Sequence, residues 1–189
     1  SFYPDRIVQG KFTADAKSSS EIHSNYESPA NLFQSPSITF KFSINGKDNE
    51  MKPGVDHHFN CLLVNGICET PLLQFGKQFK DDRVIPANSY LSPNTKLFIK
   101  LDMRSVLEAF KNDGFYKTYD GSKIFAADFK GIYVAGATEP MSWDFDNLFQ
   151  KEVLQLKDPD GDGIYETTMI LNEEKKTKDL ASSWKLSRD

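Results

Sequence analysis

The sequence predicts an all-β domain, an antiparallel β-sandwich with one short helix, and three observations lead to this. The 189 residues include 15 Phe and 7 Tyr, and aromatic side chains are enriched in strands. Apolar and polar residues alternate in several segments, which is the pattern of half-buried strands. Turn signals separate these segments, and no regular alternation of strands with helices indicates a parallel sheet.

The predicted sandwich begins with a strand at 37–44, where apolar residues alternate with polar ones. Two strands, 57–64 and 67–76, are expected to flank Asn65-Gly66, a dipeptide favoured in two-residue hairpin turns. Further strands are predicted at 95–103, at 131–137 and on either side of 158–163. We expect these strands to bury Ile38, Phe40, Phe42, Leu97, Ile99, Ile132, Val134, Leu154 and Leu156.

One helix is predicted after the strand at 95–103. Ser105 and Glu108 have the spacing of a capping box, and Gly114 is placed to end the helix. Its apolar side would consist of Val106, Ala109 and Phe110.

The chain divides into three parts by composition. Residues 1–36 are polar and interrupted by Ser and Pro, which indicates an arm or linker. The sandwich is expected to span 37–172, and two smaller β domains divided near 116–130 are the alternative. Residues 173–189 are charged and weakly patterned, which indicates a linker towards a C-terminal domain absent from this sequence.

Charge and hydropathy argue against two classes of partner. The net charge is −4 and the Lys and Arg residues are scattered, so the basic surface of a nucleic-acid-binding protein is not expected. The sequence contains no run of 18 apolar residues, so no membrane span is predicted. No signal peptide opens the sequence, so its first residues fit a mature N-terminus after signal removal or a shortened chain.

The two cysteines, Cys61 and Cys68, leave two geometries open. A two-residue hairpin turn at Asn65-Gly66 would place them diagonally, roughly 7–8 Å apart, which is too far for an unstrained disulfide. A four-residue loop from Leu63 to Gly66 would place them opposite each other. The cellular compartment therefore does not follow from the cysteines.

An acidic loop follows Leu156 and has two interpretations. Asp158, Asp160 and Asp162 stand at positions one, three and five of a calcium-type loop, with the Ile164 carbonyl and Glu166 as further ligands. Position twelve is Met169, where an EF-hand needs a bidentate Glu, and no helices flank the loop, so an EF-hand is excluded. A plain hairpin turn is the preferred interpretation, and calcium in a loop of another type is the alternative.

The segments "GIYVAGATEPMSWDFDN" and "LQLKDPDGDGIYETTMIL", within residues 131–171, resemble the core of early-set immunoglobulin-like modules. Such modules include the N-terminal and starch-binding modules of glycogen- and starch-acting enzymes. The Gly-x-Tyr-x-Phe hairpin of these modules is absent after Leu171, and "ATEPMSW" replaces their Phe-Asn-x-Trp run. The chain from Ser37 onwards is weakly similar to the N-terminal, non-catalytic region of secreted bacterial glycoside hydrolases.

A candidate sugar-binding loop lies within the resembling region. Trp143 and Phe145 could stack on a sugar ring, while Asp144, Asp146 and Asn147 could bond its hydroxyl groups. In the resembling modules the equivalent Trp often packs against the sheet, so a core position for Trp143 is the preferred interpretation. Tyr116 and Tyr119 form a weaker second candidate, for which packing in a turn is preferred.

Metal-dependent and hydrolytic sites are not expected elsewhere. In a strand, His57 and Cys61 would lie about 13 Å apart on one face while His58 points to the other, which argues against a zinc site. No Gly-x-Ser-x-Gly motif is present, and no pair of carboxylates is marked as a glycosidase pair. We therefore expect that this chain alone is not an enzyme.

The resemblance implies a non-catalytic N-terminal module of a secreted carbohydrate-active enzyme, extracellular or periplasmic in a bacterium. Its partners would be a polysaccharide or oligosaccharide and a covalently linked catalytic domain. The alternative is an extracellular protein-interaction or adhesion module, with calcium as a stabilising ion. No other cofactor is expected.

Overall fold

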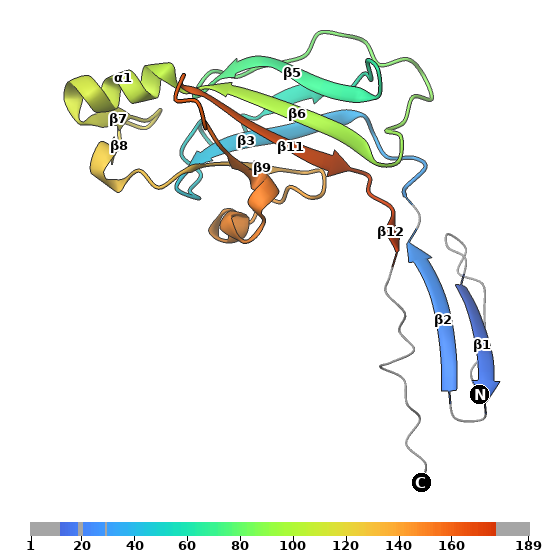
Figure 1. The fold of residues 1–189 in the computed structure, drawn as a ribbon. Coiled ribbons are helices and arrows are strands. Elements are labelled where there is room, and N and C mark those ends of the chain that lie inside the picture. Colours follow the sequence, from blue (N-terminus) through green and yellow to red (C-terminus); the bar gives the residue numbers. More distant parts are fainter. Residues whose placement is uncertain (1–11, 19–20, 29, 177–189) are drawn as a thin grey trace.

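The computed structural model describes residues 12–18, 21–28 and 30–176, and most of its regular structure consists of strands (Figure 1). The larger sheet has the order β10-β9-β3-β4, with every pairing antiparallel. Its strands are β10 Gln155–Leu156, β9 Ile132–Gly136, β3 Ser37–Ile44 and β4 His57–Asn60.

A second sheet has the order β11-β6-β5, with β11 at Ile164–Leu171, β6 at Thr95–Asp102 and β5 at Ile67–Gln74. β11 and β6 are antiparallel over eight residue pairs, from Ile164↔Asp102 to Leu171↔Thr95. β5 runs parallel to β6, so the expectation that every pairing is antiparallel is wrong at this edge.

The predicted hairpin around Asn65-Gly66 forms only as a turn. Val64 and Ile67 exchange both backbone hydrogen bonds, at 3.0 and 3.1 Å, and Asn65 and Gly66 have positive φ. The flanking strands do not pair, because β4 joins the larger sheet and β5 joins the smaller one. The turn is therefore the crossing point from one sheet to the other.

One hydrophobic core contains residues from both sheets. β3 is central in the larger sheet, and its Phe40 and Phe42 rings meet edge to face at 5.6 Å. The nine residues predicted to be buried are all at most 1% exposed, which confirms the alternation that identified these strands. The core includes residues on both sides of 116–130.

The helix α1, Arg104–Asp113, begins two residues earlier than the predicted capping box, with Ser105 as its N-cap, would allow. Met103 is the N-cap residue and no side chain caps the helix, so the prediction that Ser105 caps it is wrong. The Asp102 carboxylate instead accepts a hydrogen bond from the Arg104 backbone N–H at 2.9 Å. Gly114 ends the helix in the left-handed conformation, as predicted.

The chain then forms the hairpin β7–β8, Phe115–Lys117 and Lys123–Phe125, followed by the short 3₁₀ helix η1, Ala126–Asp128. α1 and this hairpin lie at one end of the molecule (Figure 1).

A third sheet extends from the opposite end of the molecule (Figure 1). It consists of β1 Phe12–Ser18, β2 Glu21–Ser28 and β12 Lys175–Lys176, in the order β1-β2-β12. Strands thus form inside both segments that were expected to be linkers. No helix within the described ranges is long and apolar enough to cross a membrane.

Candidate functional site

The candidate sugar-binding loop connects β9 to β10 and contains two 3₁₀ helices, η2 Phe145–Gln150 and η3 Glu152–Leu154. In a 3₁₀ helix, residues three apart lie on the same side. Phe145 and Leu148 form the inward side: Leu148 is fully buried and Phe145 is half-buried against the core. Phe145 therefore anchors the loop and does not serve as the stacking ring that was predicted.

Trp143 is 41% exposed, so the preferred interpretation of a core Trp is wrong. Trp143 lies two residues before η2, in which Phe145 and Leu148 face the core. The indole therefore stays at the surface. Phe149, which the sequence did not single out, is 65% exposed. The spacing of Phe145 and Leu148 could have identified Phe149, because these two residues occupy the inward side.

Polar side chains beside Trp143 hold one another in fixed orientations. Asn147 donates from Nδ2 to Asp144 Oδ2 at 2.7 Å, and Gln150 donates from Nε2 to Asn147 Oδ1 at 2.8 Å. Asp144, Asp146 and Asn147 are exposed. The loop thus presents a partly exposed indole next to ordered hydrogen-bonding groups.

The acidic loop forms a tight turn between β10 and β11. Asp158 accepts hydrogen bonds from the backbone N–H groups of Gly161, Asp162 and Gly163, at 2.8, 3.1 and 2.8 Å. Asp162 accepts one from the Ile164 N–H at 2.8 Å. These contacts make the carboxylates part of the turn itself.

Three of the five predicted calcium ligands come together. The carboxylates of Asp158, Asp160 and Asp162 offer oxygen atoms that lie within 4.8 Å of one another. Glu166 is not part of this group, since it stands in register with Lys100 on β6. The Ile164 residue begins β11, paired with Asp102.

The electrostatics of this loop reflect its crowding. Burial acts to raise the pKa of Asp158, but hydrogen bonds from the Gly163 N–H and its neighbours outweigh it and lower that pKa. The pKa of Asp160 is raised, chiefly by its hydrogen bond with Asp158. The loop therefore has the donor chemistry for a hard cation, and among the Asp, Glu, His and Cys side chains of the described residues these three carboxylates form the ligand group.

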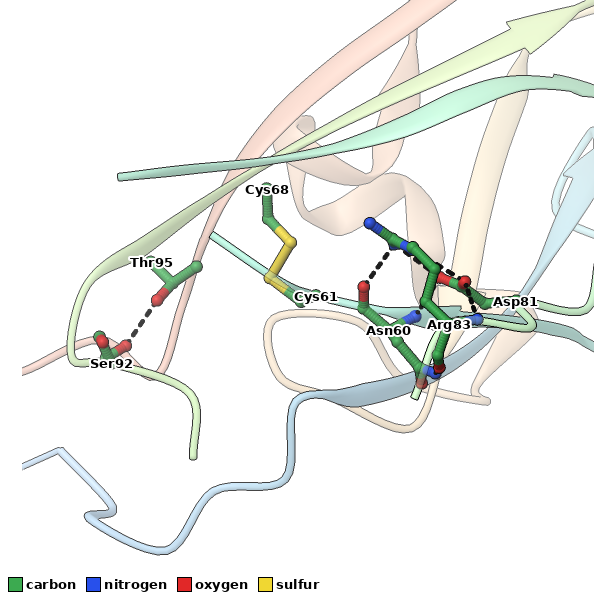
Figure 2. The surroundings of a disulfide bond; sticks show 7 residues. All are labelled: Asn60, Cys61, Cys68, Asp81, Arg83, Ser92 and Thr95. Carbon is green, nitrogen blue, oxygen red and sulfur yellow. Dashed lines mark hydrogen bonds and ion pairs between the residues drawn. A yellow bond between two sulfur atoms is a disulfide. The ribbon is translucent and has the colours of Figure 1, made fainter. Parts of the chain in front are cut away.

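The residues considered for zinc have other partners. Cys61 and Cys68 form a disulfide with their Cα atoms 5.4 Å apart (Figure 2). The diagonal geometry does not apply, because Cys61 lies beyond the end of β4 rather than in a hairpin strand. His58 is exposed, whereas His57 is fully buried between β3 and the chain at Phe79.

His57 and Glu50 form a buried polar pair that the sequence did not reveal. Nε2 of His57 lies 2.8 Å from Oε1 of Glu50, and Nδ1 of the same ring accepts a hydrogen bond from the Phe79 N–H at 3.0 Å. Nε2 is therefore the donor to Glu50. Glu50 also accepts from the N–H groups of Phe42 and Gly76, so both side chains are satisfied in the interior.

The second aromatic candidate is divided between core and surface. Tyr116 packs against Phe75 with ring centroids 5.8 Å apart, and burial, with the Glu50 charge, raises its pKa. Tyr119 is 48% exposed. The two rings do not act as one platform.

Comparison of the chain with protein-family models, curated proteins and solved structures found no match.

Proposed function

We propose that this chain is a non-catalytic glycan-binding module of a secreted carbohydrate-active enzyme. The observation that carries the proposal is the 41% exposure of Trp143 on a loop fixed by buried Leu148. An exposed indole offers a flat apolar face to the C–H groups of a sugar. The adjacent Asp144, Asp146 and Asn147 offer donors and acceptors to its hydroxyl groups.

The architecture that we propose is an immunoglobulin-like β-sandwich in the broad sense. The four-stranded and three-stranded sheets share one core, which supports two facing layers. The strand order differs from the ABED and CFG sheets of constant immunoglobulin domains, since β9 lies beside β3 and β5 is parallel to β6. The likeness is therefore one of layers and not of topology.

The module would function outside the cytoplasm, linked to a catalytic domain. The buried Cys61–Cys68 disulfide fits a chain that matures in an oxidising compartment, such as the bacterial periplasm or the extracellular space. A covalently linked catalytic domain would supply the chemistry, and the module would hold the enzyme on a polysaccharide.

A single substitution tests the sugar-binding loop. Trp143→Ala should abolish retardation of the protein in a gel containing an α-glucan. It should lower the free energy of unfolding by about 1–2 kcal/mol, less than the ~3–5 kcal/mol expected for a buried Trp. The indole is already partly hydrated, so its removal leaves a smaller cavity.

Tyr119→Ala is the matched control, because Tyr119 is an aromatic residue of similar exposure on another loop. It should leave retardation unchanged. Retardation equal in the wild type and the Trp143→Ala variant would refute the role of this loop. Loss of retardation in Tyr119→Ala alone would move the sugar site to the β7–β8 hairpin.

A protein-interaction module is the second candidate, favoured by the exposed Leu63 and Val64 beside the disulfide, at 41% and 69%. In that case calcium at Asp158, Asp160 and Asp162 would serve as a stabilising ion. A pull-down with glucan-free cell-surface extract that depends on Val64 would favour this function.

A further inference from the structure

A groove of about 450 Å³ lies between β5 and the segment 79–83, away from the Trp143 loop. Its walls are Glu69, Thr70 and Pro71 on one side and Asp81, Asp82 and Arg83 on the other, with Phe79 between them. The volume falls within the range of small-molecule sites, roughly 300–1,000 Å³. Phe79 packs against the core, so the apolar part of the groove rests on a fixed base.

The wall formed by 79–83 is attached to the free edge of β4. Backbone hydrogen bonds join His58 N–H to the Phe79 carbonyl at 2.8 Å and Asp81 N–H to the His58 carbonyl at 2.9 Å. The buried His57 holds the Phe79 N–H from the interior. This wall is thus an added strand-like segment of the larger sheet.

Side chains complete the same wall around Asn60 (Figure 2). Arg83 donates from Nε and Nη2 to the two oxygens of Asp81, at 2.9 and 2.6 Å, and from Nη2 to the Asn60 carbonyl. The Asp81 side chain is 3% exposed, and its pKa is lowered to about 2, chiefly by the hydrogen bond from Arg83. The guanidinium is therefore held in one orientation, and its Nη1 makes no hydrogen bond within the described chain.

The disulfide ties the two walls together (Figure 2). Cys61 directly follows Asn60 of β4, and Cys68 directly precedes Glu69 of β5. The two sulfur atoms are buried, so the tie lies beneath the groove surface. The separation of the walls is thus set by a covalent bond and does not depend on a ligand.

Two of the three carboxylates in the groove have cationic partners. Arg83 neutralises Asp81, and Lys100 neutralises Glu69 at 2.6 Å. The Asp82 carboxylate makes no hydrogen bond within the described chain. A ligand here meets donors at Arg83 and Thr70, an acceptor at Asp82, and apolar surfaces at Phe79 and Pro71.

We propose that this groove binds one neutral sugar residue. A pyranose has an apolar C–H face for Phe79 and Pro71 and hydroxyl groups that both donate to Asp82 and accept from Arg83. A simple anion would face the unpaired Asp82, and a simple cation would face the Arg83 guanidinium with Asp82 as its single unpaired carboxylate. A neutral polyol can donate to Asp82 and accept from Arg83 at once. The site lies on other elements than the Trp143 loop and shares with the proposed function only its ligand class.

Titration of the ¹⁵N-labelled full chain with maltose, cellobiose and lactose tests this, each to about 20 mM. At least one sugar should shift the backbone amide signals of Thr70, Phe79 and Asp82 in a saturable manner. Asp82→Ala should weaken this binding about tenfold, through loss of a hydrogen bond to a charged group. Asp113→Ala, at an exposed Asp beyond the groove, should not change it.

The amide signals of the groove and of residues 143–150 report separately. Shifts confined to 143–150 would refute the groove and leave the proposed function standing. Shifts confined to the groove would support this site and refute the Trp143 loop. No saturable shift in the groove with any of the three sugars, or larger shifts with acetate or methylammonium, would overturn the proposal.

Discussion

At the scale of single residues, Asp81 joins the segment 79–83 to the end of β4. It accepts the Asn60 N–H at 2.9 Å, binds Arg83 through both oxygens, and also accepts the Arg83 N–H. These donors stabilise the carboxylate form, so the pKa of Asp81 is about 2 in the folded chain against an ordinary value of 3.8. A depressed folded pKa contributes stability that is present above the ordinary pKa and is lost as pH falls through the folded one.

We therefore expect Asp81→Asn to be less stable than the wild type at about pH 7, by about 2 kcal/mol. The gap should close as pH falls from about 4 towards about 2, because the wild-type carboxylate is then protonated as well. Urea unfolding at several pH values measures it. A gap that is the same at about pH 2.5 as at about pH 7 would contradict the role of the charge.

Single residues also mark where prediction from the sequence failed. Ser105 and Glu108 have capping-box spacing, but the backbone of Met103 already donates to the Gly163 carbonyl at 2.9 Å, and the helix begins there. Trp143 was expected in the core from its place in a resembling motif. The motif did not show that Phe145 and Leu148, three residues apart, supply the inward side of η2 instead.

At the scale of elements, the turn between β10 and β11 depends on its first aspartate. The Asp158 carboxylate accepts hydrogen bonds from three consecutive backbone N–H groups, those of Gly161, Asp162 and Gly163. These bonds form the turn without an ion. Gly161 and Gly163 have φ of 74° and 85°, which non-glycine residues rarely adopt.

Asp158→Ala is accordingly expected to cost about 1–3 kcal/mol, since it leaves these N–H groups without their acceptor. EDTA should shift the melting temperature of the wild type by less than about 1 °C, because a ligand stabilises only by binding the folded state. Thermal unfolding with EDTA and with added CaCl₂ checks both. A fall of several degrees in EDTA, reversed by calcium, would show that the loop holds the ion.

The strands themselves were predictable, but their partners were not. Alternation located β3, β6 and β9, because one face of each lies on the core. The alternation of apolar and polar residues does not show which strands are neighbours in a sheet. The strands 57–64 and 67–76 were therefore expected to pair across Asn65-Gly66, but they lie in different sheets. β5 runs parallel to β6 because the long connection 75–94 returns the chain to the end of the sheet where β5 began.

At the scale of the whole molecule, the Cys61–Cys68 disulfide joins the end of β4 in one sheet to β5 in the other. It spans seven positions of the chain. The sequence could not show whether this bond forms. A two-residue hairpin turn places the cysteines too far apart, whereas a four-residue loop places them opposite each other.

Replacing both residues, Cys61→Ala with Cys68→Ala, should lower the free energy of unfolding by about 2–4 kcal/mol. A short closed loop restricts the unfolded chain, and the buried sulfur atoms leave a cavity when removed. Urea unfolding of the double variant measures the loss. Stability within about 0.5 kcal/mol of the wild type would show that the two sheets hold together without the bond.

The Asn172 side chain, just after β11, binds the segment that leads into β3 and the segment before β6. Asn172 accepts the Asn31 N–H at 2.8 Å and donates to the carbonyls of Asn31 and Leu91, each at 2.9 Å. Just outside it, Lys175 and Lys176 of β12 pair antiparallel with Ser28 and Glu27 of β2.

A tensile force applied through β2 and β12 would therefore pull adjacent antiparallel strands apart at one end. Their hydrogen bonds would break one after another, as in a zipper, rather than together under shear. The Asn172 bonds would be loaded next, before any strand of the core. The β2–β12 pairing can thus open under force while the two disulfide-linked sheets stay folded.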